Sequence, residues 1–328
     1  MENNTLSKKD YYPGLDILKF IMALFIIGSH TSLLCEFEVV HTLLLHVFDI
    51  AVPTFFTISA FLFYNKIDGL SEADSIKVFT HTLKRLIIFY VIWWLLMLPM
   101  SLITFFSIAN IKEIIFAAVM QSTFGGYWFI KALIINTVLL FICRNGIRFY
   151  VFSFLGISVY LVLAYNYKYH YLELPFSPYF SFFYQAVYFA LGAILVKLMK
   201  NKRLYIGIDI KLVFAILLLL FISLFKIGDP IARFLYPFFL VPAFTIKMNA
   251  NVSSCKKMRL ASIIMYMTQF VFIWLYGLLL SAQIDNSNNL FSYSITKFLI
   301  VTSLTLVVSY IIYKGEKTTY FNFFKYLH

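Results

Sequence analysis

Long uninterrupted runs of apolar residues are the feature that most constrains how this chain can fold. Stretches such as AILLLLFISLF and FYVIWWLLML lack the alternation of polar and apolar residues that a transmembrane β-barrel needs. A helix that crosses a bilayer needs about 20 mostly apolar residues, and such runs recur along the chain. The whole chain is 62% apolar and 13% charged, whereas a soluble domain is about half apolar and a quarter charged. We therefore expect an all-α integral membrane protein, and we exclude a soluble enzyme or a disordered chain.

Ten segments are apolar and long enough to be expected as membrane spans. The fourth and eighth are short, and residues 107–126 hold a further apolar stretch, so a bundle of about ten transmembrane helices is expected. We expect one transmembrane domain over residues 1–328, with a short cytoplasmic lead at 10–14 and a cytoplasmic tail at 314–328. The expected spans are residues 15–34, 43–64, 86–106, 127–143, 149–166, 179–198, 206–225, 232–248, 260–281 and 295–313.

The net charge of +12 is explained by the distribution of basic residues between alternate loops. Cytoplasmic loops of membrane proteins carry an excess of Lys and Arg. With the N-terminus inside, the inner segments carry Lys8, Lys9, Lys66, Lys77, Lys84, Arg85, Arg144, Arg148, Lys197, Lys200, Lys202, Arg203, Lys247, Lys256, Lys257, Arg259, Lys314, Lys317 and Lys325. The outer loops carry only Lys112, Lys168, Lys226, Arg233 and Lys297. We therefore expect both termini in the cytoplasm and no nucleic-acid partner.

The cysteines and the N-terminal segment give no sign of a metal site, a disulfide framework or a cleaved leader. Cys35, Cys143 and Cys255 lie far apart and form no CxxC pair, so we expect neither a bound metal nor disulfides. No small-residue cleavage site follows a short apolar core. The first apolar run is therefore predicted to be a retained span and not a signal peptide.

The first span, GLDILKFIMALFIIGSH, carries three ionisable side chains. A charge inside a membrane costs about 2.5–3.5 kcal/mol on insertion scales, which makes such residues candidates for function. Lys19 and His30 are eleven residues apart, so both lie on one helix face, about 16 Å apart along the axis. Asp16 lies one turn before Lys19 on a nearby face. As alternatives, Lys19 can snorkel to the interface, and His30 can be a polar group satisfied by neighbouring helices.

The second span, LLLHVFDIAVPTFFTISAFLF, contains His46, Asp49 and Pro53. Asp49 and His30 each lie a few residues from the outer end of their span, so we expect them at the same depth. If the two spans are neighbours, Asp49 can hold one ring nitrogen of His30 and leave the other as a general base. Contacts of Asp49 with Lys131 or with His46 are the alternatives. Pro53 frees backbone groups that need a cavity or a partner.

Polar residues in later spans are less specific. Tyr127, Trp128 and Lys131 open the fourth span in GGYWFIKAL. Tyr and Trp at a span end are ordinarily part of the aromatic belt, and Lys131 can snorkel outward. Gln269 in the ninth span is typical of a residue that hydrogen-bonds between helices. We take these four as candidate substrate-binding residues beside these structural alternatives.

The opening motifs resemble those of the acyltransferase-3 family of integral membrane acyltransferases. GLDILKF supplies a basic residue, Lys19, that is followed after ten residues by His30. Residues 52–62, VPTFFTISAFL, are similar to a second family segment, with Ala60 where Gly is usual. The resemblance extends over the whole chain, including its length and its ten expected spans.

Three further segments carry the resemblance or depart from it. The basic start of the third span matches through Lys84, Arg85 and Leu86. Trp128 and Phe129 match a Trp-Phe opening of a later span. In SIIMYMTQ, Ser262 and Tyr266 are kept, but Ile264 replaces Gly and Gln269 replaces His. Because a Gln side chain is neither an acid nor a base, proton transfer at that position is put in question.

The resemblance implies a reaction and a site. It implies transfer of an acyl group, with acetyl expected, from acyl-CoA to a hydroxyl of a cell-surface glycan or a lipid-linked saccharide, in the bacterial cytoplasmic membrane. His30 with Asp49 would be the catalytic pair. Lys19, Lys84 and Arg85 would bind the CoA phosphates as cationic partners, although Lys84 and Arg85 can instead be ordinary inner-loop charges. Acyl-CoA would act as a substrate, and no permanently bound cofactor is expected.

The alternative function is a multi-span transporter or exporter of a saccharide or its precursor. The intramembrane charges and Pro53 are compatible with transport. The lack of an internal repeat counts against it, because many transporters are built from repeats. The opening motif with Lys19 and His30 favours the enzyme.

Overall fold

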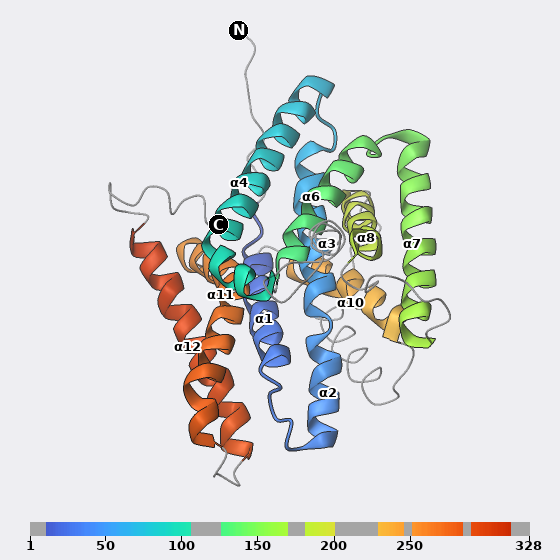
Figure 1. The fold of residues 1–328 in the computed structure, drawn as a ribbon. Helices are drawn as coiled ribbons and strands as arrows, with labels where there is room; N and C mark the ends of the chain where they lie inside the picture. Colours follow the sequence, from blue (N-terminus) through green and yellow to red (C-terminus); the bar gives the residue numbers. More distant parts are fainter. Residues whose placement is uncertain are drawn as a thin grey trace.

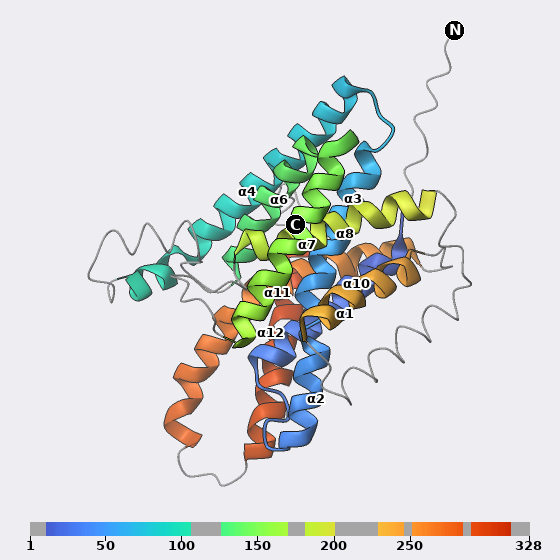
Figure 2. The same cartoon turned by 90° about the vertical axis from the view of Figure 1, so that its right-hand side faces the viewer.

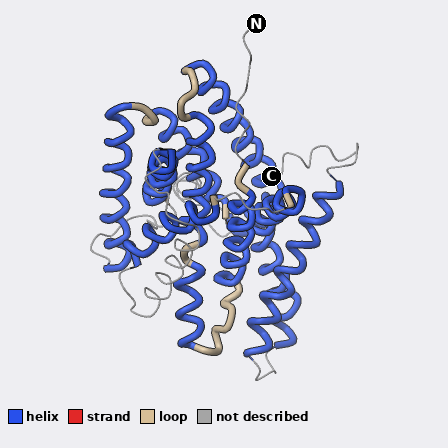
Figure 3. The backbone as a smooth tube through the Cα atoms, turned by 180° about the vertical axis from the view of Figure 1, so that it is seen from behind, coloured by secondary structure: helices blue, strands red, loops and turns tan. Residues whose placement is uncertain are grey.

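The computed structural model describes the backbone of residues 11–105, 126–169, 181–200, 229–245, 251–284 and 290–315. All regular secondary structure in these ranges is helical (Figures 1 and 3), with no strand among them. The expected all-α fold is therefore confirmed for the described part of the chain. The helices are α1 Pro13–His30, α2 Glu38–Phe48, α3 Ala51–Ile67, α4 Glu72–Phe105, α6 Tyr127–Ile142, α7 Gly146–Tyr169, α8 Phe182–Lys200, α10 Asp229–Phe244, α11 Val252–Ile284 and α12 Leu290–Gly315.

Seven of the described helical segments are long and apolar enough to cross a membrane, and two shorter apolar helices accompany them. The shorter ones are Tyr127–Ile142 and Arg233–Phe244, at the two positions where the sequence predicted short spans. The expected span at 206–225, the apolar stretch at 107–125 and the tail beyond residue 315 lie outside the described residues. The expected number of ten spans stays a prediction.

The second expected span is not one continuous helix. It divides into α2 and α3 at Asp49 and Ile50, both of which keep right-handed helical φ and ψ angles, and it remains a single membrane-span candidate over Glu38–Ile67, as expected. Pro53 lies in the first turn of α3, where its missing N–H costs least and its fixed φ suits a helix start. The hydroxyl of Thr54 donates to the Ile50 carbonyl oxygen at 2.7 Å, which secures the new helix beside the break.

Helices α4 and α11 begin well before the apolar runs from which spans 86–106 and 260–281 were predicted. α4 starts at Glu72 and occupies much of the expected loop at 65–84. Ser71 caps this helix, with the Asp74 N–H donating to Ser71 Oγ at 3.2 Å as at an N-cap, and Ser71 Oγ donating to Asp74 Oδ2 at 2.8 Å. α11 starts at Val252 because Asn251 Oδ1 accepts from the Ser253 N–H at 3.0 Å. Helix caps, which hydropathy does not register, set both starts.

The core is organised around α3, which packs against α8, α1 and α10 (Figures 1 and 2). Gly192 on α8 meets the α3 backbone so closely that an added Cβ would lie 2.6 Å from the Thr57 carbonyl oxygen. Small residues allow such close approach between membrane helices. A second group is formed where α11 packs against both α1 and α12. Helix α1 therefore contacts both the group around α3 and the group formed by α11 and α12.

Several helix ends gather at one end of the bundle. Lys200 Nζ at the end of α8 pairs with Asp68 Oδ2, after α3, at 2.7 Å. Arg144 Nη2, after α6, pairs with Glu72 Oε2 at the start of α4 at 2.5 Å. Segments expected to form cytoplasmic loops thus lie together. The side of the membrane that this end faces stays a prediction from the positive-inside pattern.

The close contact between α3 and α8 predicts a large difference between two glycine substitutions. Gly192→Ala should lower stability by about 1–3 kcal/mol, as overpacking does, because the new methyl group meets backbone atoms. Gly277→Ala inside α11 should not lower stability and should raise it by up to about 1 kcal/mol, since nothing lies within 4 Å of its added Cβ. Thermal unfolding of the detergent-solubilised variants, followed by loss of the monodisperse chromatographic peak, measures both. Equal midpoints for the two variants would contradict the close approach.

Candidate functional site

His30 is the last residue of α1 and lies exposed at the surface of the protein. Its ring packs against Phe270 of α11, with the ring centroids 4.7 Å apart. Within the described residues, neither of its ring nitrogens has a hydrogen-bond partner. The imidazole is therefore held by an aromatic contact on one side, and its nitrogens form no hydrogen bond with the described part of the chain.

The turn that follows His30 has an unusual backbone. Ser32 and Leu34 adopt positive φ angles of 55° and 58°, a left-handed conformation that is uncommon for residues other than glycine. Thr31 Oγ1 donates to the Ile27 carbonyl oxygen at 2.8 Å, and His41 Nδ1 lies 3.0 Å from the Leu33 carbonyl oxygen. Such backbone conformations persist only where surrounding contacts impose them, and they cluster at functional sites.

Asp49 lies at the break between α2 and α3, and its carboxylate is bound to Arg233 near the start of α10. The distance from Arg233 Nη2 to Asp49 Oδ2 is 2.6 Å. The expected hydrogen bond between His30 and Asp49 is not formed. The reason is geometric, because the ring of His30 turns toward α11 whereas Asp49 faces α10.

His30 and Asp49 nevertheless belong to neighbouring segments. Gly28 lies two residues before His30, and an added Cβ there would lie 2.7 Å from the ring of Phe48. Phe48 directly precedes Asp49, and it also packs against Phe25 with centroids 5.6 Å apart. The packing of α1 on the end of α2 thus places both polar residues at the same region of the bundle.

Arg233 is the residue of this region that the sequence interpretation missed. It was counted only as an outer-loop charge, although an Arg that begins an apolar run is a natural partner for an Asp inside another span. Its guanidinium also interacts electrostatically with Tyr184 on α8. Tyr184 is buried, with its ring centroid 4.8 Å from that of Tyr160 on α7. Arg233 thus links α2 and α3 to α7 and α8.

The opposite part of α1 carries a cluster of cations around one buried carboxylate. Asp16 is 4% exposed and accepts a hydrogen bond from the Tyr11 hydroxyl at 2.8 Å. Burial and this bond raise the pKa of Tyr11, so its hydroxyl remains a neutral donor. Lys19 is half-buried and interacts electrostatically with Asp16. The other cations that act on Lys19 are Arg259, Lys66 and Arg85.

The predicted donor-site residues do not all join this cluster. Lys19 and Arg85 lie within electrostatic range of each other and of Arg259. Lys84 lies on the exposed surface of α4 and is not among the charges that act on Lys19. Lys66 and Arg259 are cluster members that the sequence interpretation treated only as topology signals. The structure thus brings together cations from α1, α3, α4 and α11.

Tyr127 and Trp128 are buried and are not an aromatic belt at the lipid interface. The Tyr127 hydroxyl donates to the Trp93 carbonyl oxygen of α4 at 2.6 Å. Trp128 is 7% exposed and packs against Phe56 of α3 with centroids 6.2 Å apart. Lys131, one turn after Tyr127 on α6, is half-buried. The start of α6 is thus fixed against α3 and α4.

Gln269 lies inside the protein beside the aromatic residue that supports His30. Its side chain is fully buried, and Nε2 donates to the Tyr266 carbonyl oxygen at 3.2 Å. Among the residues that the structure describes, Oε1 has no hydrogen-bond partner. A buried acceptor without a hydrogen bond costs free energy. Oε1 of Gln269, next to Phe270 in the sequence, is therefore able to accept one further hydrogen bond.

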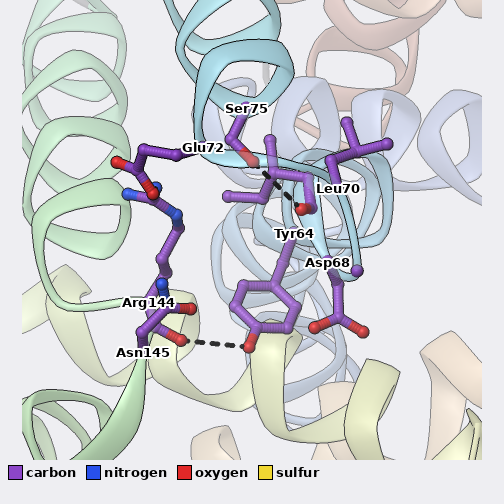
Figure 4. A pocket seen from close by; sticks show the side chains of 9 residues that line it. Tyr64, Asp68, Leu70, Glu72, Ser75, Arg144 and Asn145 are labelled. Atoms are coloured by element: carbon purple, nitrogen blue, oxygen red, sulfur yellow. Dashed lines mark hydrogen bonds and ion pairs between the residues drawn. The ribbon is translucent and has the colours of Figure 1, made fainter.

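A small polar cavity lies at the end of the bundle where α3 meets α4 (Figure 4). Its volume is about 50 Å³, and Tyr64, Asp68, Glu72, Ser75 and Arg144 are among its lining residues. The Tyr64 hydroxyl donates to the Arg144 carbonyl oxygen at 3.2 Å. A space of this size accommodates water molecules and not a nucleotide or a sugar. Within the described ranges, no group of three or more His, Cys, Asp or Glu side chains is placed to hold a metal ion.

Comparison with known proteins identifies the family. Residues 12–314 match the acyltransferase-3 family model, which is described as an acyltransferase domain. No curated protein and no solved structure matches the chain. The family match covers nearly the whole chain, including the first helix with Lys19 and His30 and the helices that carry Arg233 and Gln269. The resemblance carried by the sequence motifs is thereby confirmed, and the chain belongs to the acyltransferase-3 family of membrane acyltransferases.

Proposed function

We propose that this protein transfers an acyl group, with acetyl expected, from acyl-CoA to a hydroxyl of a cell-surface glycan or a lipid-linked saccharide. The observation that carries the proposal is the arrangement along α1, which begins in the cation cluster around Lys19 and ends at the exposed imidazole of His30. Membership of the acyltransferase family favours this reaction over saccharide transport. The expected location is the bacterial cytoplasmic membrane, with the cation cluster facing the cytoplasm.

The proposed reaction uses His30 as the general base. A ring nitrogen removes the proton of the acceptor hydroxyl, and the hydroxyl oxygen attacks the carbonyl carbon of the thioester. The carbon–sulfur bond then breaks, and the CoA sulfur leaves and takes up a proton. The exposed ring supports this role, since no protein group within the described residues competes for its nitrogens. Positioned general bases contribute about 10²–10⁴-fold to rates.

The proposed donor site is the cation cluster at the start of α1. CoA is polyanionic, and ammonium and guanidinium groups bind phosphates by charge-assisted hydrogen bonds. Lys19 and Arg85 are the proposed ligands, with Lys84 at the surface nearby, and Arg259 adds a fourth cation. Lys19 and His30 are eleven positions apart on α1, a distance of about 16 Å along the axis. The pantetheine arm has to span this distance for the thioester to reach the base.

The remaining candidate residues are proposed to form the acceptor side. Asp49 lies in the segment that packs on α1 beside His30. Lys131 and Gln269 are proposed to contact the substrate, the latter through the unused acceptor of its amide. Tyr127 and Trp128 are proposed to support the same region, since both are buried against neighbouring helices.

Replacement of His30 tests the general base. His30→Ala should lower acetyl transfer from acetyl-CoA at least about 100-fold, because no base remains to activate the hydroxyl. Transfer of radiolabelled acetyl groups by protein in lipid nanodiscs measures the rate. His81→Ala is the matched control, because His81 is an exposed residue of α4 without an assigned role. A rate in His30→Ala equal to that of the control would remove His30 from the reaction.

Replacement of Lys19 tests the donor site. Lys19→Gln should raise the KM for acetyl-CoA about tenfold and leave kcat nearly unchanged, because the loss of a charge-assisted hydrogen bond weakens ground-state binding. Raising the salt concentration should raise the wild-type KM, since it screens the attraction. Lys314→Gln, at the exposed end of α12, controls for the general loss of a positive charge. An unchanged KM in Lys19→Gln would place the phosphates elsewhere.

A further inference from the structure

The ion pair between Asp49 and Arg233 is the strongest feature that the proposed chemistry leaves unexplained. It joins residues 184 positions apart and lies at a break within the membrane-span candidate Glu38–Ile67. The side chains are nevertheless partly accessible, at 36% for Asp49 and 17% for Arg233. An ion pair made only for packing gains little over apolar residues of similar volume. Its location and accessibility therefore suggest that it meets a ligand.

Three buried tyrosines of α7 and α8 lie near Arg233, the cation of the pair. Arg233 interacts electrostatically with Tyr160, Tyr184 and Tyr188, and the Tyr160 and Tyr184 ring centroids are 4.8 Å apart. These three rings are at most 3% exposed, and the Tyr160 and Tyr188 centroids are 5.6 Å apart. The guanidinium therefore lies beside the packed tyrosines of α7 and α8, and its ion pair with Asp49 holds it in place. A preorganised donor of this kind loses little conformational entropy when it binds a ligand.

The pair also lies beside the proposed base. Phe48 packs against Gly28 of α1. Asp49 comes directly after Phe48, and His30 comes two residues after Gly28, so this contact places the two polar residues in neighbouring segments. A ligand held by Asp49 and Arg233 would reach the region of the exposed imidazole. This location fits the acceptor better than the donor, because Lys19 of the proposed phosphate site lies about 16 Å from His30 along the axis of α1.

We propose that Asp49 and Arg233 form a subsite for a neutral saccharide acceptor, an inference that rests on the proposed acyl transfer. A carboxylate accepts hydrogen bonds and a guanidinium donates them in a planar fork, so together they recognise neighbouring hydroxyls of a sugar ring. The opposite charges of the pair compensate each other, so the subsite offers no surplus positive charge to an acidic sugar. An acidic sugar would also bring its carboxylate close to that of Asp49, and like charges disfavour binding.

The test compares two acceptors that differ in one group, using full-length protein in lipid nanodiscs. The probes are methyl α-D-glucopyranoside, which is neutral, and methyl α-D-glucuronide, which carries a carboxylate on the same ring. Transfer of radiolabelled acetyl from acetyl-CoA gives KM and kcat for each probe. Release of CoA without added acceptor reports the donor half of the reaction separately. The wild type is expected to prefer the neutral probe by about tenfold or more in kcat/KM.

Two conservative variants test the subsite residues. Asp49→Asn and Arg233→Gln should each raise the KM for the neutral glycoside about tenfold, the effect of losing a hydrogen bond to a charged group. CoA release without acceptor should change less than twofold. Arg144→Gln is the matched control, because Arg144 forms a comparable pair with Glu72, at 2.5 Å, beside the small polar cavity. Its KM for the glycoside should equal that of the wild type.

Exchange of the two charges separates binding from folding. The double variant Asp49→Arg with Arg233→Asp retains an ion pair between the same helices but reverses the positions of donor and acceptor. It should remain folded by chromatography and still show the raised KM. Recovery of the wild-type KM in this variant would show that the pair only supports the fold, and the subsite would be rejected.

Three other outcomes distinguish this inference from the proposed function. An unchanged glycoside KM in both single variants would overturn the subsite and leave the acyltransferase in place. His30-dependent CoA release without transfer to the neutral probe, or transfer to the acidic probe alone, would overturn the assignment of a neutral acceptor. No His30-dependent use of acetyl-CoA in any assay would overturn the proposed function, and the subsite with it.

Discussion

The break at Asp49 and Ile50 between α2 and α3 is the feature on which the arrangement of the region around His30, Asp49 and Arg233 depends. In a bilayer, backbone groups released by a helix break have to be satisfied within the protein. The hydroxyls of Thr54 and Thr57 donate to the carbonyl oxygens of Ile50 and Pro53 at 2.7 and 2.9 Å, which secures the first turn of α3. Asp49, placed at the break, is then in reach of Arg233.

The two polar regions of α1 differ in their electrostatic character. At the start, Lys19 lies among several cations with Asp16 as the buried counter-charge, so the region carries a surplus of positive charge. Near its end, the neighbouring acid and base of Asp49 and Arg233 compensate each other. A positively charged region suits the proposed polyanionic donor, and a charge-compensated region suits the proposed neutral acceptor. Both regions lie along one helix of 18 residues.

Hydropathy and charge patterns predicted the helical class and the positions of the spans, because lipid demands apolar runs of a set length. They did not predict where α4 and α11 begin, since Ser71 and Asn251 cap those helices through hydrogen bonds that contribute nothing to hydropathy. The motif with Lys19 and His30 identified the family, which the match over residues 12–314 confirmed. The partner of Asp49 was not predictable from local spacing, because Arg233 lies 184 residues away and only the packed bundle brings the two together.

The position of His30 at the last residue of α1 leaves its backbone anchored on one side by a helix and on the other by a left-handed turn. The direction of the imidazole therefore depends on residues 31–36 as much as on the bundle. A short surface turn tolerates sequence change more readily than a packed helix. Variation in this turn can accordingly change the direction of the His30 ring, the proposed base, while the cations around Lys19 and the core stay the same, which would give this scaffold a route to new regioselectivity.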